Sequence, residues 1–400
     1  MRIKGELPPE AIFLLEDFRL AVNNAIRIGH QARVTSRNAL TKLAYKDFRL
    51  EHPGMYAQHL VSAFEVAGSV LKNYRRRLMT RAASRAPYVH RLMMKAENQA
   101  YKLDRQRGII DLPIRAGCHI KLELEVSDYH RRYLDDLTLG LGSLTVLPDR
   151  VIVAFRKEAP ESYVPESALS LDTNERSMDG VFVKSDEARA AKADYQDIAA
   201  IQQRHHVRRR RLQKKKAHDR RTSKRLCRRE GRREHDRIEY RLHQVANAVL
   251  SFAEDQRAAI ILEDLKGIKP KRSKEMNRRL SLWPRRKLHR IIEYKAEWNG
   301  IPVIKVDPRY SSRTCPICGR IQDSRMGAEF VCECGWRLDR HINASLNLLQ
   351  TAVSKGLEVA GGLRFNPGAF QHDVMMILYE PAMAARSEPN GTSCIGAVTS

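Results

Sequence analysis

Four cysteines in two short pairs constrain the fold of this chain more than any other feature. Cys315 and Cys318 are separated by two residues and Cys332 and Cys334 by one, and a glycine follows each pair. Two tight turns that present four thiolates to one ion are typical of a zinc ribbon, and glycine permits the positive φ that such turns use. We expect one structural Zn²⁺ on these thiolates. Because the second pair is one residue short, the alternatives are a three-cysteine site completed by another group, such as His341, or no metal.

Charge indicates the kind of partner. Lys and Arg number 72 against 47 acidic residues, a formal net charge of +25, which predicts a polyanion, nucleic acid first. A membrane surface is the alternative, but no apolar run approaches the roughly 20 residues of a spanning helix. The first residues lack the layout of a secretory signal, so we expect a cytoplasmic protein with reduced thiols, in which Cys118, Cys227 and Cys394 are incidental.

Shifts in hydrophobic pattern divide the 400 residues into several parts. We expect a helical lobe over 1–85 with room for a first barrel strand at 1–8, a small antiparallel β-barrel over 86–158, a linker at 159–168, an α/β domain formed by 169–312 and 336–352, a zinc ribbon at 313–335, and a flexible tail at 353–400.

Two segments carry dense positive charge. Residues 204–241 hold 18 Lys or Arg and five Asp or Glu, and their apolar continuation at helical spacing predicts a helical pair that docks on a core. A solvated face or a disordered basic arm is the alternative. The candidate nucleic-acid contacts, here and at the end of the helical lobe, are Arg208, Arg209, Arg210, Arg211, Lys214, Lys215, Arg75 and Arg76.

Three acids stand at the ends of predicted elements. Asp172 ends a strand, Glu263 ends the buried strand "AAIILE", and Asp339 starts the helix after the cysteines, expected at about 337–351. Carboxylates that converge at one end of a sheet suit Mg²⁺, and two such ions about 4 Å apart can catalyse phosphodiester hydrolysis. Taken alone, an acid at a strand end or a helix N-terminus is more often a cap or turn residue than a metal ligand.

The local sequence around these acids resembles the TnpB family of insertion-sequence nucleases, relatives of compact type V CRISPR effectors and Fanzors. The resemblance rests on "SLDTNERSMDGV", "IILEDLKGI" and "LDRHINASLNLL", with the cysteine pairs between the second and third, and on "YKAEWNGIPVIKVDPRYSSRTCPICG". It covers residues 166–352 strongly and the upstream part more loosely.

The resemblance implies a multidomain α/β fold, with an RNase H-like (RuvC) nuclease core, an inserted zinc ribbon, a helical recognition lobe and a WED-like barrel. The family's catalytic triad and Mg²⁺ ligands fall on Asp172, Glu263 and Asp339, and the zinc ligands fall on the four cysteines. It implies an RNA-guided DNA endonuclease with guide RNA and target DNA as partners, which cuts beside a short target-adjacent motif and acts in a prokaryotic cytoplasm at the nucleoid. One copy or two on each RNA are both compatible with it.

The third motif departs from the family at one position. Relatives often continue Asp-Arg-Asp, whereas this chain has Asp339, Arg340 and His341, so one accessory carboxylate is missing. Asn343 lies four residues after Asp339 on the same helix face, and Asn343 and Arg340 are accessory candidates. The alternatives to a guided nuclease are a guide-independent RNase H-like nuclease, a nuclease-inactive RNA-guided repressor, and a zinc-ribbon binding protein without chemistry.

Overall fold

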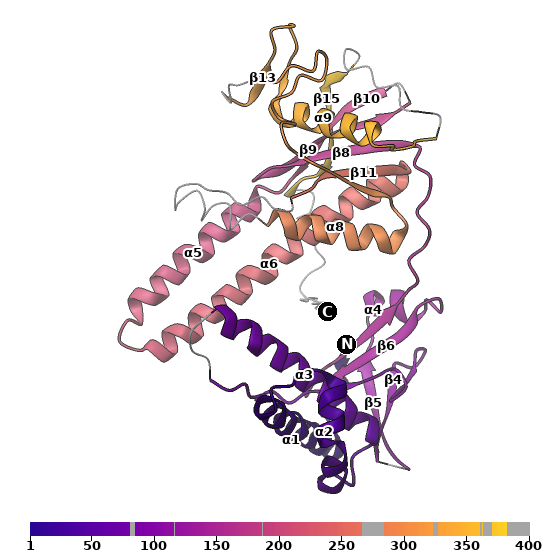
Figure 1. The fold of residues 1–400 in the computed structure, drawn as a ribbon, viewed down its shortest axis with the longest axis vertical. Coiled ribbons are helices and arrows are strands. Elements are labelled where there is room, and N and C mark those ends of the chain that lie inside the picture. The colour runs from indigo at the N-terminus through magenta and orange to yellow at the C-terminus, as the bar shows by residue number, and fades with distance from the viewer. Residues whose placement is uncertain are drawn as a thin grey trace. The chain divides into compact units, whose positions relative to one another are not determined.

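The computed structural model describes residues 1–80, 85–115, 117–185, 187–265, 284–322, 327–360, 362 and 370–381. It divides into two compact units, an N-terminal unit, Met1–Glu158, and a C-terminal unit, Ala159–Ser400 (Figure 1). Within the described part of the chain, no helix combines the length and the apolar character needed to cross a membrane.

Three helices begin the N-terminal unit: α1 (Pro9–Gln31), α2 (Arg37–Glu51) and α3 (Ala57–Thr80). The Ser36 hydroxyl caps α2 by accepting the backbone N–H of Ala39 at 3.2 Å. Gly68 lets α3 pass close to the loop between α1 and α2, since a Cβ at Gly68 would lie 2.7 Å from the carbonyl oxygen of Thr35.

Two antiparallel sheets complete this unit. One has the order β1 (Arg2–Ile3), β5 (Cys118–Glu125), β4 (Ile109–Arg115) and β3 (Lys102–Asp104), and the other has the order β2 (Met94–Ala96), β6 (Gly140–Val146) and β7 (Val151–Arg156). A bridge between Arg2 and Arg150 joins them, and the short helix α4 (Asp128–Leu134) follows β5.

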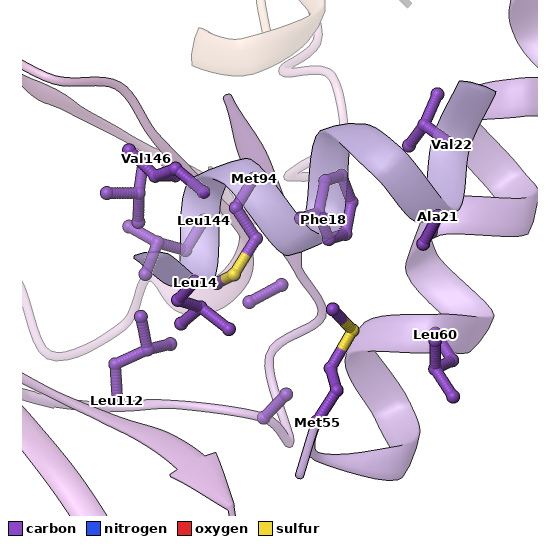
Figure 2. Close-up of a cluster of buried hydrophobic side chains, with 14 of the residues drawn as sticks. Leu14, Phe18, Ala21, Val22, Met55, Leu60, Met94, Leu112, Leu144 and Val146 are labelled. Carbon is purple, nitrogen blue, oxygen red and sulfur yellow. The ribbon is translucent and has the colours of Figure 1, made fainter. Parts of the chain in front are cut away.

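The core of the N-terminal unit lies between its helices and its sheets. Figure 2 shows Leu14 and Phe18 of α1 among Met94, Leu144 and Met55. All five side chains are buried. The helices and the strands therefore share one core, which explains why the two parts form a single compact unit.

The C-terminal unit contains a six-stranded sheet in the order β12 (Val303–Val306), β11 (Ala258–Glu263), β8 (Ser167–Thr173), β9 (Ser177–Lys184), β10 (Glu187–Asp194) and β15 (Gln371–Tyr379). Strands β8, β9 and β10 form an antiparallel meander, whereas β11 runs parallel to β8, and β12 runs parallel to β11. Both faces of β8 and β11 are covered: β11 is almost continuously apolar, and β8 combines small polar residues with Ala and Leu and is still buried on both faces.

Helices cover both faces of this sheet (Figure 1). Helix α6 (Arg220–Asp255) and helix α8 (Arg285–Asn299) pack with Leu169 and Leu171 on one face, and α9 (Arg340–Ser354) packs with Ala168 and Ile261 on the other. Helix α5 (Asp197–Lys215) pairs with α6 as a hairpin that contains nearly all of residues 204–241.

The helix after the cysteines begins later than the predicted start at about residue 337. Residues Arg337–Asp339 form strand β14, which pairs with β13 (Glu329–Val331), and α9 begins at Arg340. Leu338 pairs with Phe330 across the two strands, so ribbon packing outweighs the local helical pattern at these positions.

The prediction of a flexible tail over 353–400 is wrong for residues 371–379. They form β15, which pairs in parallel with the edge of the sheet at β10. The alternating and apolar stretch "QHDVMMILY" supplies side chains such as Tyr379 to the core beside α6. Residues 382–400, with Cys394, lie outside the described residues.

Candidate functional site

The four cysteines converge on one point. The Sγ atoms of Cys315 and Cys334 lie 3.5 Å apart, as do those of Cys318 and Cys332, and all four lie within 4.8 Å of one another. A tetrahedron of thiolates about 2.3 Å from a zinc ion has similar edges. The shortened pair therefore contributes both of its cysteines to a cluster that can hold one zinc ion.

Two glycine turns produce this geometry. Gly319 and Gly335 follow the two pairs at φ of 72° and 93°, in the left-handed region that the sequence predicted for them. Their backbone N–H groups donate hydrogen bonds of 3.0 Å to the carbonyl oxygens of Cys315 and Cys332. The pKa of the Cys332 thiol is lowered to about 6, mainly by a hydrogen bond from the backbone N–H of Cys334. This favours a thiolate at that position.

Asp172 and Glu263 lie side by side at the carboxyl ends of neighbouring parallel strands. Leu171 of β8 is in register with Leu262 of β11, so the acids that follow share the face covered by α9. The backbone N–H of Thr173 donates a hydrogen bond of 2.9 Å to Glu263 Oε1. In parallel sheets this edge is the usual place for a ligand.

Burial disfavours the ionised form of both carboxylates. Burial, reinforced by the charge of Asp172, raises the pKa of Glu263 to about 7. Burial also raises the pKa of Asp172, against a hydrogen bond from His341 that favours the charged form. Two buried acids that oppose each other's ionisation would be relieved by a cation, so the pair fits a divalent metal ion.

The third predicted acid, Asp339, caps α9. Its Oδ1 accepts the backbone N–H groups of His341 at 2.8 Å and Ile342 at 3.2 Å. Within the described residues, the four cysteines are the only group of three or more His, Cys, Asp or Glu side chains close enough to share one ion. Asp172, Glu263 and Asp339 therefore do not all lie within single-ion distance of one another in this structure.

His341 lies at the acids and not at the cysteines. Its Nδ1 is 2.9 Å from Asp172 Oδ2, and its side chain is 30% exposed. Although burial alone would lower the pKa of His341, the hydrogen bond with Asp172 and the charges of Asp172 and Asp339 outweigh it and raise that pKa. This geometry excludes His341 as a substitute ligand of the zinc site.

The two accessory candidates have different surroundings. Arg340 is partly buried, and its charge acts on Asp172 in the direction that lowers the pKa of that acid. Asn343 is fully buried and faces the ribbon: its Oδ1 accepts the indole N–H of Trp336 at 3.2 Å, and its Nδ2 donates to the Thr314 carbonyl at 3.0 Å. Asn343 therefore holds α9 against the ribbon, whereas the sequence had placed it as an accessory residue beside Asp339.

Sequence reasoning missed a fourth carboxylate. Asp179 of β9 stands directly opposite Asp172 in the antiparallel register, and its Oδ2 accepts hydrogen bonds of 2.6 Å from Asn174 and Ser177. Its charge raises the pKa of Asp172. The three-residue connection between β8 and β9 was the signal that could have placed it, because so short a turn fixes the pairing of the strands.

A buried histidine supports the same strands from the other face. His289 Nε2 of α8 lies 2.6 Å from the Thr173 hydroxyl. Burial lowers the pKa of His289 to about 4, so the imidazole is neutral at pH 7. This residue carried no local signal in the sequence beyond its place in a helix.

The basic residues of the α5–α6 hairpin fall into two groups. Arg209 pairs with Glu234, and Arg208 lies 3.6 Å from Glu230, which also accepts from the buried His205. These contacts join the two helices. The side chains of the other candidates on α5, Arg210, Arg211, Lys214 and Lys215, are exposed.

The remaining two candidates belong to the N-terminal unit. Arg75 and Arg76 are exposed in the last turns of α3, and the Arg75 guanidinium donates a hydrogen bond to the carbonyl oxygen of Arg33. Exposure leaves both side chains accessible to an anionic partner.

Taken together, the chain is a multidomain α/β protein with a four-cysteine ribbon beside a group of buried acids. A family model described as "Cas12f1-like, TNB domain" matches residues 286–348, and one described as "Uncharacterized protein MJ0013 family" matches residues 14–110. The TnpB-like protein MJ0751 of Methanocaldococcus jannaschii is 30% identical over 247 residues, which cover 59% of this chain and 88% of that relative. The chain belongs to the TnpB-like family.

Other similarities extend to type V effectors. A CRISPR-associated endodeoxyribonuclease Cas12f1 of Sulfoacidibacillus thermotolerans is 35% identical over 117 residues, which cover 28% of this chain and 27% of that protein. The fold resembles that of Cas12f1 in a complex with sgRNA and target DNA, with a TM-score of 0.52 and 14% identity over 84% of this chain and 81% of the other. It also resembles the mini-RNA-guided endonuclease CRISPR-Cas_phi3, with a TM-score of 0.53 and 11% identity over 90% of this chain and 92% of the other.

Proposed function

We propose that this protein is an RNA-guided DNA endonuclease of the TnpB type, which hydrolyses phosphodiester bonds of a target DNA beside a short target-adjacent motif. Membership of the TnpB-like family supports this function, as do the names of the Cas12f relatives as endodeoxyribonucleases. In such proteins a guide RNA reads most of the target by base pairing.

The observation that carries the proposal is the pairing of Asp172 with Glu263. Both carboxylates end parallel strands on one face of the sheet, and the hydrogen bond of 2.9 Å from Thr173 N–H to Glu263 Oε1 fixes one of them beside the other. Their raised pKa values indicate a site that favours a bound cation. An antiparallel meander followed by two parallel strands, with helices on both faces, agrees with an RNase H-like (RuvC) core.

In this proposal Asp172, Glu263 and Asp339 hold Mg²⁺, with two ions per site. Bound Mg²⁺ would supply an activated water and stabilise the leaving oxygen. Asp172 and Glu263 would hold the ion from the sheet, and Asp339 from the start of α9 through its second carboxylate oxygen, since Oδ1 is engaged by the helix. His341 orients Asp172 through Oδ2.

We assign a structural role to the cysteine cluster. A four-thiolate zinc site has no open position for a substrate, so it contributes to folding and not to chemistry. Hydrogen bonds from Asn343 and Asn347 of α9 to Thr314, beside the first cysteine, connect the ribbon to the helix that carries Asp339. The ribbon therefore supports the third acid.

The charge of +25 and the exposed side chains of α5 supply the surface for RNA and DNA phosphates. The N-terminal unit, with its helical lobe and antiparallel sheets, would act as the recognition lobe and WED-like barrel that hold the guide and read the adjacent motif. A protein with these partners would act in the cytoplasm at the nucleoid, with one or two copies on each RNA.

The test is purification at moderate salt, sequencing of the RNA that accompanies the protein, and cleavage of a DNA that matches its variable segment. We expect a discrete RNA, Mg²⁺-dependent cleavage, and loss of cleavage with retained DNA binding in Asp172→Ala. Cleavage that survives removal of the RNA would instead identify a guide-independent nuclease. Guided binding without cleavage by the wild type would identify an inactive, repressor-like protein.

A further inference from the structure

Ser345 of α9 is fully buried beside the acids, and its hydroxyl connects two strands. Its Oγ accepts a hydrogen bond of 3.0 Å from the backbone N–H of Asp172 and donates one of 2.7 Å to the carbonyl oxygen of Asp179. Asp172 and Asp179 face each other across β8 and β9. The Ser345 hydroxyl thus joins the backbone of Asp172, a candidate metal ligand, to the backbone of Asp179 on the next strand.

A further hydrogen bond holds the same helical residue. The Ser170 hydroxyl donates to the carbonyl oxygen of Ser345 at 2.8 Å, and both residues have no exposed surface. Sliding of α9 along the sheet would leave these buried polar groups without partners and is therefore disfavoured. Helix α9 consequently has one defined position on the sheet, at Ser345.

This position matters because α9 begins with Asp339. The Asp339 carboxylate is fixed to the first turn by two backbone N–H groups, so it moves with the helix. A helix rises about 1.5 Å per residue and is stiff over so few turns, so its contact with the sheet determines where its first turn lies. The separation between Asp172 and Asp339 is therefore set where Ser345 meets β8.

We propose that Ser345 is a positioning residue for the divalent cation site, because its hydrogen bonds determine where Asp339 lies relative to Asp172. This inference rests on the proposed function, because it assumes that these acids share a metal site. Mg²⁺ demands nearly ideal octahedral geometry, so a small displacement of one ligand weakens binding. Groups that orient metal ligands typically change metal affinity or activity by about 10- to 100-fold when removed.

Two matched serine variants separate positioning from simple stability. Ser170→Ala removes a buried hydrogen bond between β8 and α9 but leaves the bond from Ser345 to the Asp172 N–H intact. Ser354→Ala removes a hydroxyl from the exposed end of the same helix, where it donates only to the Thr351 carbonyl. A structural role alone would make Ser345→Ala resemble Ser170→Ala.

The experiment uses the full-length protein and its Ser345→Ala, Ser170→Ala and Ser354→Ala variants. Mn²⁺, which accepts the same oxygen ligands, is titrated against each protein while the spectrum of free Mn²⁺ is followed by electron paramagnetic resonance. We expect Ser345→Ala to weaken Mn²⁺ binding by about 10- to 100-fold. Ser170→Ala, which removes only one of the three hydrogen bonds that fix α9, should weaken it much less, and Ser354→Ala should stay within about twofold of the wild type. Amide hydrogen exchange of peptides that contain Asp172 should increase in Ser345→Ala. If that variant does not fold, Ser345→Cys, which keeps the volume but weakens both bonds, takes its place.

Equal Mn²⁺ affinities in Ser345→Ala and Ser170→Ala, with the wild type cutting a guided target, would overturn the positioning role and leave the proposed function standing. Conversely, a wild type that binds Mn²⁺ in a Ser345-dependent manner but cuts nothing with its own RNA would retain the positioning role and refute the proposed function.

Discussion

The side-chain amide of Asn343 donates a hydrogen bond of 3.0 Å to the carbonyl oxygen of Thr314, the residue directly before Cys315. Asn347, one helical turn further, donates to the same oxygen at 2.8 Å. Two buried amides of α9 therefore hold the start of the ribbon. A change that loosens the ribbon should therefore also loosen the contacts of α9, the helix that begins after Asp339.

The first prediction concerns zinc. Purified protein should contain about one zinc per chain, and Cys332→Ser should lose most of it, because the folding energy of such modules comes largely from the metal. Zinc content by mass spectrometry and thermal unfolding of the same sample test this. Cys227→Ser, which alters an isolated cysteine in α6, is the control and should retain its zinc. Less than about half an equivalent in the wild type would show that the cluster is not a zinc site.

The second prediction concerns the junction between ribbon and helix. Asn343→Ala leaves the Trp336 indole N–H without its partner and removes one of the two amides at Thr314, so unfolding should become easier by about 1 to 3 kcal/mol. Urea unfolding measures this. Gln350→Ala, which removes a more peripheral bond to Pro316, should cost less. Equal losses in the two variants would contradict a special role for Asn343.

The third prediction concerns pH and His289. Because the folded protein keeps this imidazole neutral down to a pKa of about 4, the unfolded chain binds a proton that the folded chain does not between pH 6.5 and 4. The free energy of unfolding should therefore fall as pH decreases through this window, by on the order of 3 kcal/mol from this residue. Urea unfolding of the wild type and of His289→Gln across the window gives the difference.

The slope in His289→Gln should be shallower than in the wild type. Glu263 acts in the opposite sense, since its raised pKa of about 7 makes stability decrease as pH rises, but it is present in both proteins. Parallel pH curves for the two proteins would contradict a neutral, buried His289.

The fourth prediction concerns the α5–α6 hairpin. Replacing Arg210, Arg211, Lys214 and Lys215 together by Gln should weaken RNA binding and reduce the slope of log K against log salt by about 3, as expected for four lost phosphate contacts. Filter binding of the copurified RNA over a salt series measures both quantities. Arg209→Gln is the control, since its partner is Glu234 and its loss should lower stability with little effect on the slope. An unchanged slope in the fourfold variant would show that these four side chains do not bind RNA phosphates.

The fifth prediction concerns Gly180 of β9. A Cβ at this residue would lie 2.1 Å from the Ser170 carbonyl oxygen, so Gly180→Ala must displace backbone next to Asp172 and Asp179. We expect a loss of stability of about 1 to 3 kcal/mol, as for other overpacked sites. Gly231→Ala, in an open position on α6, should be neutral or stabilising by up to about 1 kcal/mol. Similar denaturation midpoints for the two variants would refute the steric argument.

Much of the C-terminal unit was predictable from local pattern. The expected strand ending near Asp172 ends at Thr173, and the apolar segment "AAIILE" forms β11 and ends at Glu263. Buried parallel strands read as continuous apolar runs, and a polar residue at the end of such a run is conspicuous. This signal selects Glu263, whereas Asp172 stood out as the acid near the end of the predicted strand before the hairpin turn; the register then places the two side by side.

Tertiary packing decided what the pattern could not. Helical spacing placed Asn343 with Asp339, but contacts to Trp336 and Thr314 turn it toward the ribbon. The pairing of β15 with β10 joins segments far apart in sequence, and no local pattern specifies such a partner. The role proposed for Ser345 likewise depends on its hydrogen bonds with β8 and β9, which the local sequence does not specify.

The place of β15 in the sheet has a consequence for how the protein is made. Strand β10 ends at Asp194 and β15 spans Gln371–Tyr379, so the ribosome adds a long stretch of chain after β10 before the last strand of the sheet exists. Until then the edge of β10 is a row of unsatisfied peptide groups to which another nascent chain can add. Synthesis of β15 is therefore also the step that protects this sheet from association with neighbouring chains on a polysome.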